Sequence, residues 1–253
     1  MGTPNLFILG AGKCGTTTLY HLLGSHPEIQ VSVPKEPSFF CSYFQVVRDP
    51  ITYFALFDSQ RRYRVDASHA YLSDPKTAPV LRDLFPESKF ILILRHPKAR
   101  AHSLYRHMRR SMHSDGRPFE LSEDFHEALI LEDERFEAPE FAASCRQYFW
   151  NFMYMRSSFY DVQLLRYLEL FSRDQFLIVT LAELHGQPEC VLSKISTFLD
   201  VSREGFSPNV PVSNAAPAYE AFSAACDALM EERFGDLTRR VEMIAGRVLD
   251  WSR

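Results

Sequence analysis

A glycine-rich turn near the start of the chain constrains the fold more than any other segment. Residues 5–9 form a short apolar run that leads directly into GAGKCGTTT at residues 10–18. The run predicts a buried strand, and residues 16–25, with leucines on one side, predict a helix. Glycines permit a tight turn that brings backbone N–H groups close to an anion, and a helix N-terminus adds its positive dipole end. The segment therefore predicts a phosphate-binding turn between a strand and a helix.

The turn differs from two widespread nucleotide-binding sequences. A nucleoside-triphosphate loop places its lysine directly before serine or threonine, whereas here Lys13 precedes Gly15 and Thr16 follows. The turn is also not interpreted as a dinucleotide fingerprint, because threonines follow Gly15 and no acidic ribose-binding residue is evident about 20 residues further on. A plain glycine-rich turn is the remaining alternative. The candidate cofactor-binding residues of the turn are Gly12, Lys13, Cys14, Gly15, Thr16, Thr17 and Thr18.

The turn and the residues after it resemble the 5′-phosphosulfate loop of sulfotransferases that use 3′-phosphoadenosine-5′-phosphosulfate (PAPS). The shared pattern is an apolar run, then G-x-x-K-x-G-T-T-x-L over residues 10–19, then His26-Pro27. It is more similar to carbohydrate sulfotransferases and their bacterial relatives than to the cytosolic phenol and steroid enzymes. The resemblance implies an α/β, P-loop-like sulfotransferase fold, in which helices flank a central, mostly parallel sheet. It also implies that Lys13 stabilises the leaving phosphate.

A second segment supplies candidate ligands for the 3′-phosphate. Residues 89–94 form an unbroken apolar run, which predicts a central strand, and Arg95 follows it directly. Ligands bind at the carboxyl ends of strands in open α/β sheets, and arginine offers a forked donor for phosphate. Ser103 offers a hydroxyl about two turns into a helix predicted at residues 97–110. The pattern R-H-P-x-x-R-x-x-S-x-Y over residues 95–105 resembles the family's 3′-phosphate motif.

Two residues are candidates for the general base that removes the proton of the acceptor. The segment KEPSFF at residues 35–40 resembles one in carbohydrate sulfotransferases whose glutamate is the base, which implies this role for Glu36. The segment DASHAY at residues 66–71 falls where the cytosolic enzymes carry a catalytic histidine, which implies the role for His69. Histidine is a natural base near neutral pH, whereas glutamate needs burial to raise its pKa. The sequence leaves open whether Glu36, His69 or neither alone is the base.

Composition excludes several classes of protein. An apolar fraction of 46% and a net charge of −4 over 253 residues fit a single folded domain at residues 1–253 and not a disordered chain. The apolar runs are far shorter than the roughly 20 residues of a membrane span. A pI near 6.1 argues against a nucleic-acid partner. Seven Lys and Arg residues and one acid at residues 95–117 form either a solvated face or a rim that attracts an anion.

The rest of the chain alternates between strand and helix patterns, which is typical of a parallel α/β sheet. The five scattered cysteines have no metal-like spacing, so we expect reduced thiols and no metal. The aromatic residues at 148–154 are interpreted as helix core in preference to a platform for the acceptor, and the acids at 132–134 as an exposed helix face. Further strands are predicted at 63–66 and 175–180, helices at 77–85, 121–132, 141–156, 158–172, 188–199 and 217–249, and loops at 37–62, 111–120 and 201–216.

Together these features predict a PAPS-dependent sulfotransferase. It would transfer the sulfuryl group to a hydroxyl or amine of a small-molecule or carbohydrate acceptor by in-line displacement, leaving 3′,5′-adenosine bisphosphate. The alternatives are a P-loop-type kinase of a small molecule, for which the basic Arg95 is a poor metal ligand, and a non-catalytic nucleotide-binding module. A homodimer is one option for the assembly. No cationic segment precedes the first apolar run, which predicts a cytoplasmic protein unless this is an excised catalytic domain of a secretory-pathway enzyme.

Overall fold

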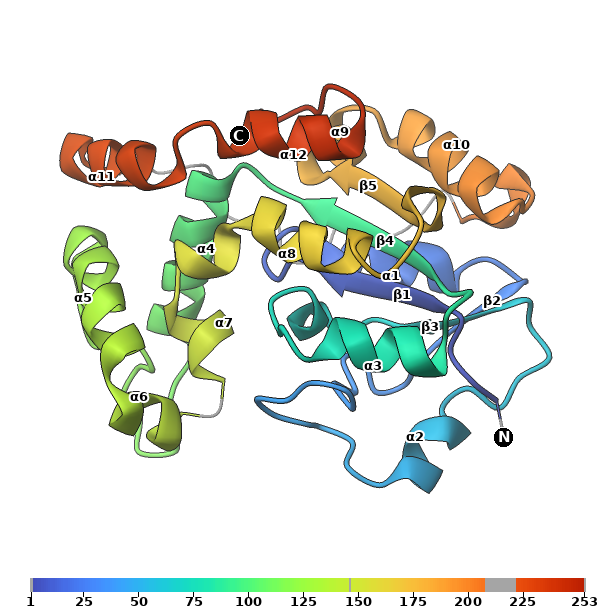
Figure 1. The fold of residues 1–253 in the computed structure, drawn as a ribbon, viewed down its shortest axis with the longest axis horizontal. Helices are drawn as coiled ribbons and strands as arrows, with labels where there is room; N and C mark the ends of the chain where they lie inside the picture. The colour runs from blue at the N-terminus through green and yellow to red at the C-terminus, as the bar shows by residue number, and fades with distance from the viewer. Residues whose placement is uncertain (1, 146, 208–221, 253) are drawn as a thin grey trace.

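Five parallel strands form one sheet in the computed structural model, which describes residues 2–145, 147–207 and 222–252 (Figure 1). The strand order is β2-β3-β1-β4-β5, and each neighbouring pair is parallel. The predicted α/β class, with a parallel sheet flanked by helices, is therefore confirmed. The strands are β1 (Leu6–Gly10), β2 (Ile29–Val31), β3 (Tyr63–Asp66), β4 (Lys89–Leu94) and β5 (Phe176–Thr180).

Helices lie on both faces of the sheet and at its carboxyl edge (Figure 1). Two short 3₁₀ helices matter for the site, η1 (His69–Tyr71) and η2 (Arg156–Ser158). The α-helices are α1 (Thr16–Gly24), α2 (Pro50–Ala55), α3 (Thr77–Leu84), α4 (Pro97–Arg110), α5 (Phe125–Glu137), α6 (Pro139–Ser144), α7 (Tyr148–Phe152), α8 (Tyr160–Leu168), α9 (Leu181–Gly186), α10 (Pro188–Leu199), α11 (Ala224–Phe234) and α12 (Leu237–Ala245).

Alternating side chains of the strands build two hydrophobic cores. On β1, Phe7 and Leu9 pack into the core that α3, α4, α8 and α12 share, whereas Leu6 and Ile8 pack into the core of α1 and α10. β4 alternates in the same way. Successive residues of a strand point to opposite faces, so a continuous apolar run is stable only where both faces are covered. Both strands meet that condition, as predicted for β4.

The strand order brings three strand ends together where a ligand can bind. Because the strands are parallel, β1, β3 and β4 all end at the same edge of the sheet. The chain places β3 on one side of β1 and then crosses to place β4 on the other. In open α/β sheets, ligands bind outside the carboxyl ends of the strands at such a switch point. The glycine-rich turn follows β1 at this position, η1 follows β3, and Arg95 follows β4.

Several predicted elements differ from the structure. The helix predicted at 121–132 begins later, because the Asp124 side chain accepts the His126 N–H and caps α5. The helix predicted at 141–156 is divided, since Cys145 has an extended backbone between α6 and α7. The three-residue strand β2 was not predicted. Neither was α9, although Thr180 and Glu183 form a capping box that the sequence displays.

One predicted exposed residue is buried, and one predicted segment lies outside the described residues. Glu132 has only 1% of its surface exposed, so its assignment to an exposed face is wrong. Its carboxylate accepts the backbone N–H groups of Met155 and Arg156 at 2.8 and 2.7 Å, which accounts for the burial. Residues 208–221, with much of the predicted loop and the start of the last predicted helix, lie outside the described residues. Among the described helices, none has the length and apolar character of a membrane span.

Candidate active site

The glycine-rich turn folds as a tight loop between β1 and α1. Gly10, Lys13 and Gly15 all have positive φ angles, of 145°, 69° and 94°. Gly15 occupies the cap position of α1, and no side chain among the described residues caps this helix start. The first backbone N–H groups of a helix have no partner within the helix. The start of α1 therefore offers N–H groups and the positive end of its dipole to an anion.

Arg100 on α4 holds the glycine-rich turn in place from the interior of the protein. Its side chain is buried, and its Nε donates a hydrogen bond of 3.0 Å to the backbone oxygen of Gly12. One Nη atom also donates to the hydroxyls of Ser157 and Ser158, at 2.7 and 2.8 Å. The sequence assigned Arg100 only to the basic segment and the 3′-phosphate pattern. In the structure it fixes the main chain of the glycine-rich turn.

Lys13 lies in a concentration of positive charge. Partial burial lowers the pKa of Lys13, and the guanidinium groups of Arg100, Arg95 and Arg110 lower it further. Among the described residues, no carboxylate forms an ion pair with Lys13. A group of cations without acidic partners favours a bound anion, because the anion relieves their mutual repulsion. Lys13, Arg95 and the start of α1 thus make this edge of the sheet suitable for an anionic ligand.

The two predicted ligands of the 3′-phosphate lie on either side of the start of α4. Arg95 follows β4 and Ser103 lies in α4, and both are half-buried. Among the described residues, neither side chain makes a hydrogen bond or ion pair. The backbone oxygen of Arg95 accepts from the Tyr160 hydroxyl at 3.1 Å, which fixes the main chain there. Both side chains therefore remain available to a ligand.

Side chains of the turn differ in how much they face outward. The thiol of Cys14 is fully buried, 3.7 Å from the Tyr160 hydroxyl, and burial raises its pKa. Its N–H donates to the backbone oxygen of Ala11 at 3.2 Å. Thr16 and Thr18 are buried, and Thr17 is half-buried. Cys14 thus supports the turn from within, and Thr17 has the most exposed of the three threonine side chains.

The two candidates for the general base contact each other. His69 lies in η1, and its Nδ1 is 2.9 Å from Oε2 of Glu36. Lys35 forms an ion pair with the other oxygen of Glu36. Burial alone would raise the pKa of Glu36, but His69 and Lys35 outweigh it and lower that pKa to about 2. Glu36 is therefore a carboxylate at neutral pH and orients the His69 ring through Nδ1.

The other ring nitrogen of His69 faces the glycine-rich turn. Nε2 is buried and has no hydrogen-bond partner among the described residues. A Cβ atom built on Gly12 would lie 3.2 Å from Nε2 and 2.7 Å from Cδ2 of His69, so glycine permits this approach. The Trp150 ring meets the His69 ring edge-on, with centroids 4.2 Å apart. The structure thus brings His69, Glu36 and the turn together, as a shared site requires.

Asp66, at the end of β3, is a buried hydrogen-bonding centre beside this pair. It is fully buried, and burial raises its pKa to about 6 although its hydrogen bonds oppose the shift. Sequence reasoning used Asp66 only for the resemblance, and its position at a strand end is the signal that could have identified it. Three hydroxyls donate to its carboxylate: Ser68 at 2.5 Å, Tyr53 at 2.7 Å and Tyr71 at 2.9 Å.

The same hydroxyls hold the segment that carries Glu36. The Ser38 N–H donates to the Ser68 hydroxyl at 2.9 Å, and the Phe40 N–H donates to the Tyr71 hydroxyl at 3.2 Å. Glu36 and Ser38 have φ angles of 62° and 51°, in a region that non-glycine residues seldom adopt. Such conformations persist where the surroundings fix them, often at functional sites. The Asp66 centre thus links the segment that carries Glu36 to the segment that carries His69.

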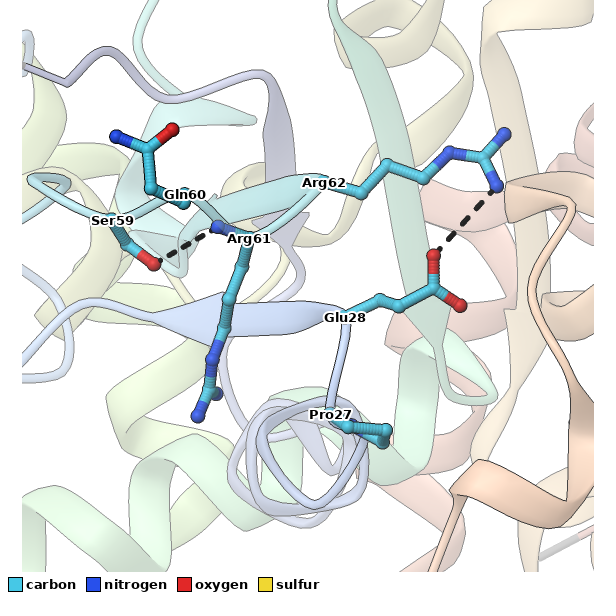
Figure 2. A pocket seen from close by; sticks show the side chains of 6 residues that line it. All are labelled: Pro27, Glu28, Ser59, Gln60, Arg61 and Arg62. Atoms are coloured by element: carbon cyan, nitrogen blue, oxygen red, sulfur yellow. Dashed lines mark hydrogen bonds and ion pairs between the residues drawn. The ribbon is translucent and has the colours of Figure 1, made fainter.

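A surface pocket at the opposite edge of the sheet is separate from this site. It lies where β2 and β3 begin (Figure 2), whereas the turn follows the carboxyl end of β1. Arg61 donates to the backbone oxygen of Ile29 at 2.7 Å, and Arg62 pairs with Asp200 at 2.9 Å. Its cations therefore already have partners. The pocket is lined by Pro27, Glu28, Ser59, Gln60, Arg61 and Arg62.

Metal ligands do not cluster in the part of the chain that the structure describes. No group of three or more histidine, cysteine or acidic side chains is arranged there to hold a metal ion. The carboxyl edge of the sheet instead collects cations and hydroxyl groups around the turn. Its chemistry suits a phosphorylated ligand bound directly by the protein.

Comparisons with known proteins agree with this geometry. The family model described as "Sulfotransferase domain" matches residues 3–215. The bifunctional heparan sulfate N-deacetylase/N-sulfotransferase 1 of Caenorhabditis elegans is 27% identical, over 78% of this chain and 22% of the relative. Carbohydrate sulfotransferase 15 of Mus musculus is also 27% identical, over 83% of this chain and 47% of the relative. The chain thus spans less than half the length of these relatives.

A solved structure matches the whole described fold. A sulfotransferase from Alicyclobacillus acidocaldarius is 29% identical, with a TM-score of 0.82 and coverage of 100% of both chains. The resemblance seen in the turn and in the 3′-phosphate segment is confirmed by a family model that spans both. Family, fold and relatives agree, and the chain belongs to the sulfotransferase family and is a transferase enzyme.

Proposed function

We propose that this enzyme transfers the sulfuryl group of PAPS to a hydroxyl or amine of a small-molecule or carbohydrate acceptor. The observation that carries the proposal is the position of His69, whose Nε2 faces Gly12 of the turn while Nδ1 meets Glu36 at 2.9 Å. A base and an anion-binding turn in contact are what transfer from a phosphosulfate requires. The family match and the names of the relatives support sulfuryl as the transferred group.

The residues of the turn fit the phosphates of PAPS, which supplies an activated sulfuryl group on its 5′-phosphate. Backbone N–H groups at the start of α1 and the Thr17 hydroxyl hold the 5′-phosphate, and Arg95 and Ser103 hold the 3′-phosphate. Lys13 offsets the negative charge that builds on the 5′-phosphate as its bond to sulfur breaks. Arg100 keeps the turn in place through Gly12. The unpartnered side chains of Arg95 and Ser103 support this assignment.

His69 and Glu36 share the proton chemistry. Because Nδ1 is directed at the Glu36 carboxylate, Nε2 is the ring nitrogen of His69 that can take up the proton of the acceptor. As the acceptor oxygen or nitrogen bonds to sulfur, its proton passes to Nε2, and Glu36 stabilises the imidazolium that forms. Both carboxylate oxygens of Glu36 are engaged, one by His69 and the other by Lys35, whereas Nε2 of His69 faces the turn, so we assign the base to His69 and orientation to Glu36.

The domain bounds, the cellular location and the oligomeric state are also proposals. The family match and the full coverage of the solved sulfotransferase support a single domain at residues 1–253. The cytoplasmic location and the homodimer stay predictions.

Binding and transfer experiments test the proposed function. We expect 3′,5′-adenosine bisphosphate to bind in calorimetry without Mg²⁺, and label to pass from sulfur-labelled PAPS to members of an acceptor library. Lys13→Ala should abolish transfer, whereas Lys76→Ala, a change at an exposed lysine, should not. A kinase would instead transfer phosphate from ATP with Mg²⁺. Absence of nucleotide binding would overturn the proposal, and binding without any transfer would favour the non-catalytic module.

A further inference from the structure

The catalytic nitrogen of His69 is covered in this structure. His69 has 8% of its surface exposed, and Nε2 itself is buried without a hydrogen-bond partner among the described residues. Two groups converge on it. A Cβ atom built on Gly12 would lie 3.2 Å from Nε2 and 3.0 Å from Cζ3 of Trp150. An acceptor must bring its reacting atom to about 3 Å from Nε2, so one of these two covering groups has to move.

The turn is the less mobile of the two. Gly12 is buried, and its backbone oxygen is held by the buried guanidinium of Arg100. Trp150 is half-buried on α7, which has five residues, and its indole N–H makes a long hydrogen bond of 3.4 Å to Gln147. Phe152, on the same helix, belongs to the hydrophobic core as predicted, whereas Trp150 packs at the core's edge. Trp150 is therefore the covering group that can give way.

We propose that the indole of Trp150 occupies the place beside His69 that a ring of the acceptor takes, so that the space it vacates favours acceptors whose reacting group is carried on a ring. The inference rests on the proposed function, which puts the acceptor at Nε2. The two rings now meet edge-on with centroids 4.2 Å apart. An incoming ring restores the contact that His69 loses when the indole moves aside, and the displaced indole can stack on the ring's apolar face. An acceptor whose reacting group is carried on a linear aliphatic chain offers neither contact.

Chemical modification of histidine tests the cover without any turnover. Diethyl pyrocarbonate adds a carbethoxy group to an accessible imidazole nitrogen and releases ethanol and carbon dioxide, and mass spectrometry of peptides assigns the site. We expect His69 to react about tenfold faster in Trp150→Ala than in the wild type, because the cover is gone. Trp150→Phe should fall between them. Trp251→Phe, a change at the other tryptophan, should leave the rate for His69 unchanged.

Two histidines of the same chain serve as internal controls. His185 is exposed on α9 and should react in every variant, which calibrates the reagent. His26 has 1% of its surface exposed and should stay unmodified in every variant that is folded. Reaction of His69 in the wild type as fast as that of His185 would contradict the proposal that Trp150 covers His69. So would equal rates for His69 in the wild type and in Trp150→Ala.

The ring preference is tested in the Trp150→Ala variant with 3′,5′-adenosine bisphosphate present. We expect naphthol or methyl glucoside to protect His69 from the reagent, and hexanol not to. Protection by naphthol alone assigns an aromatic acceptor, and protection by the glucoside alone assigns a sugar. Protection by neither ring, or equally by hexanol, would overturn the preference. Because the readout is modification and not transfer, failure of the cover and failure of sulfuryl transfer are distinguishable.

Discussion

The Nδ1 atom of His69 lies 2.9 Å from Oε2 of Glu36. The sequence presents these two residues as competing candidates for one role, because each matches a different branch of the family. In the structure they are consecutive members of one hydrogen-bonded chain, in which Glu36 orients the ring and Nε2 faces the turn. The same arrangement of a carboxylate behind an imidazole activates nucleophiles in other enzymes. We therefore predict that substitutions of Glu36 and His69 have non-additive effects on catalysis.

Substitution of either member of the pair should slow catalysis with little effect on nucleotide binding. We expect His69→Ala to lower kcat by about 10²- to 10⁴-fold, the usual contribution of a general base. Glu36→Gln should lower it as well, and the double variant should be no slower than His69→Ala, because residues that act as a unit are not additive. Steady-state rates with labelled PAPS measure this. A double variant slowed by the product of the two single effects would contradict the coupling.

Arg95 and Ser103 should discriminate between nucleotides that have and lack a 3′-phosphate. Loss of a hydrogen bond to a charged group costs about 1.5–3 kcal/mol, which corresponds to about 10- to 150-fold in affinity. We expect Arg95→Ala to weaken binding of 3′,5′-adenosine bisphosphate by that factor and binding of adenosine 5′-phosphate hardly at all. Ser103→Ala should act in the same direction with a smaller effect. Titration calorimetry measures the affinity for each nucleotide. Equal losses of affinity for the two nucleotides would refute the assignment of Arg95 and Ser103 to the 3′-phosphate.

Arg100 should affect the turn although it need not touch the ligand. Its guanidinium satisfies the Gly12 oxygen and the hydroxyls of Ser157 and Ser158 inside the protein. Lysine cannot reproduce this forked geometry, so Arg100→Lys should lower the free energy of unfolding by about 1–3 kcal/mol and weaken nucleotide binding. Urea unfolding measures the first effect. Arg239→Lys, a change at an exposed arginine, is the matched control. An equally small effect at both positions would contradict the role of Arg100 in holding the turn.

Local patterns in the sequence were sufficient to predict four of the five strands and the glycine-rich turn. The bounds of β4 and α4 match the predicted ones, because a continuous apolar run and a proline at a helix start are local signals, and the bounds of β3 match as well. The division between α6 and α7 and the strand β2 could not be predicted in this way, since three to six residues carry too little periodicity. Glu132 was misassigned because its burial depends on backbone groups of η2, which are distant in the sequence.

The residues of the candidate site were named from sequence motifs, whereas their geometry was not predicted. Lys13, Glu36, His69 and Arg95 were all identified from motifs, each within its own segment. Contacts between segments place them: the Tyr53 hydroxyl of α2 donates to Asp66, and Arg100 reaches back to Gly12. No spacing in the sequence encodes such contacts. The roles of Asp66, Arg100 and Trp150 therefore became apparent only once the strand ends were placed side by side.

Asp66 should make the stability of the protein depend on pH. Burial raises its pKa from 3.8 to about 6, so the folded protein holds this proton more tightly than the unfolded chain does. The contribution of Asp66 to the free energy of unfolding is fully present below a pH of about 4. It is lost as the pH rises through about 6, by up to about 3 kcal/mol. Asp66→Asn cannot ionise, so urea unfolding should show a shallower loss between these pH values. Burial also raises the pKa of Glu132, to about 7, and this group contributes the same pH dependence in both proteins. Identical pH profiles of the two proteins would exclude Asp66 as a source.

Gly12 should not tolerate the smallest side chain. A Cβ atom at this position would lie 2.7 Å from Cδ2 of His69 and 3.0 Å from Cζ3 of Trp150, closer than real Cβ contacts. Gly12→Ala should therefore displace the base from the turn and lower kcat by about 10²-fold or more, as loss of a positioned base does. Gly186→Ala is the matched control, because a Cβ there meets nothing within 4 Å. Rates with labelled PAPS and diethyl pyrocarbonate modification of His69 report the two effects separately. Full activity of Gly12→Ala would mean that His69 does not need its close contact with the turn.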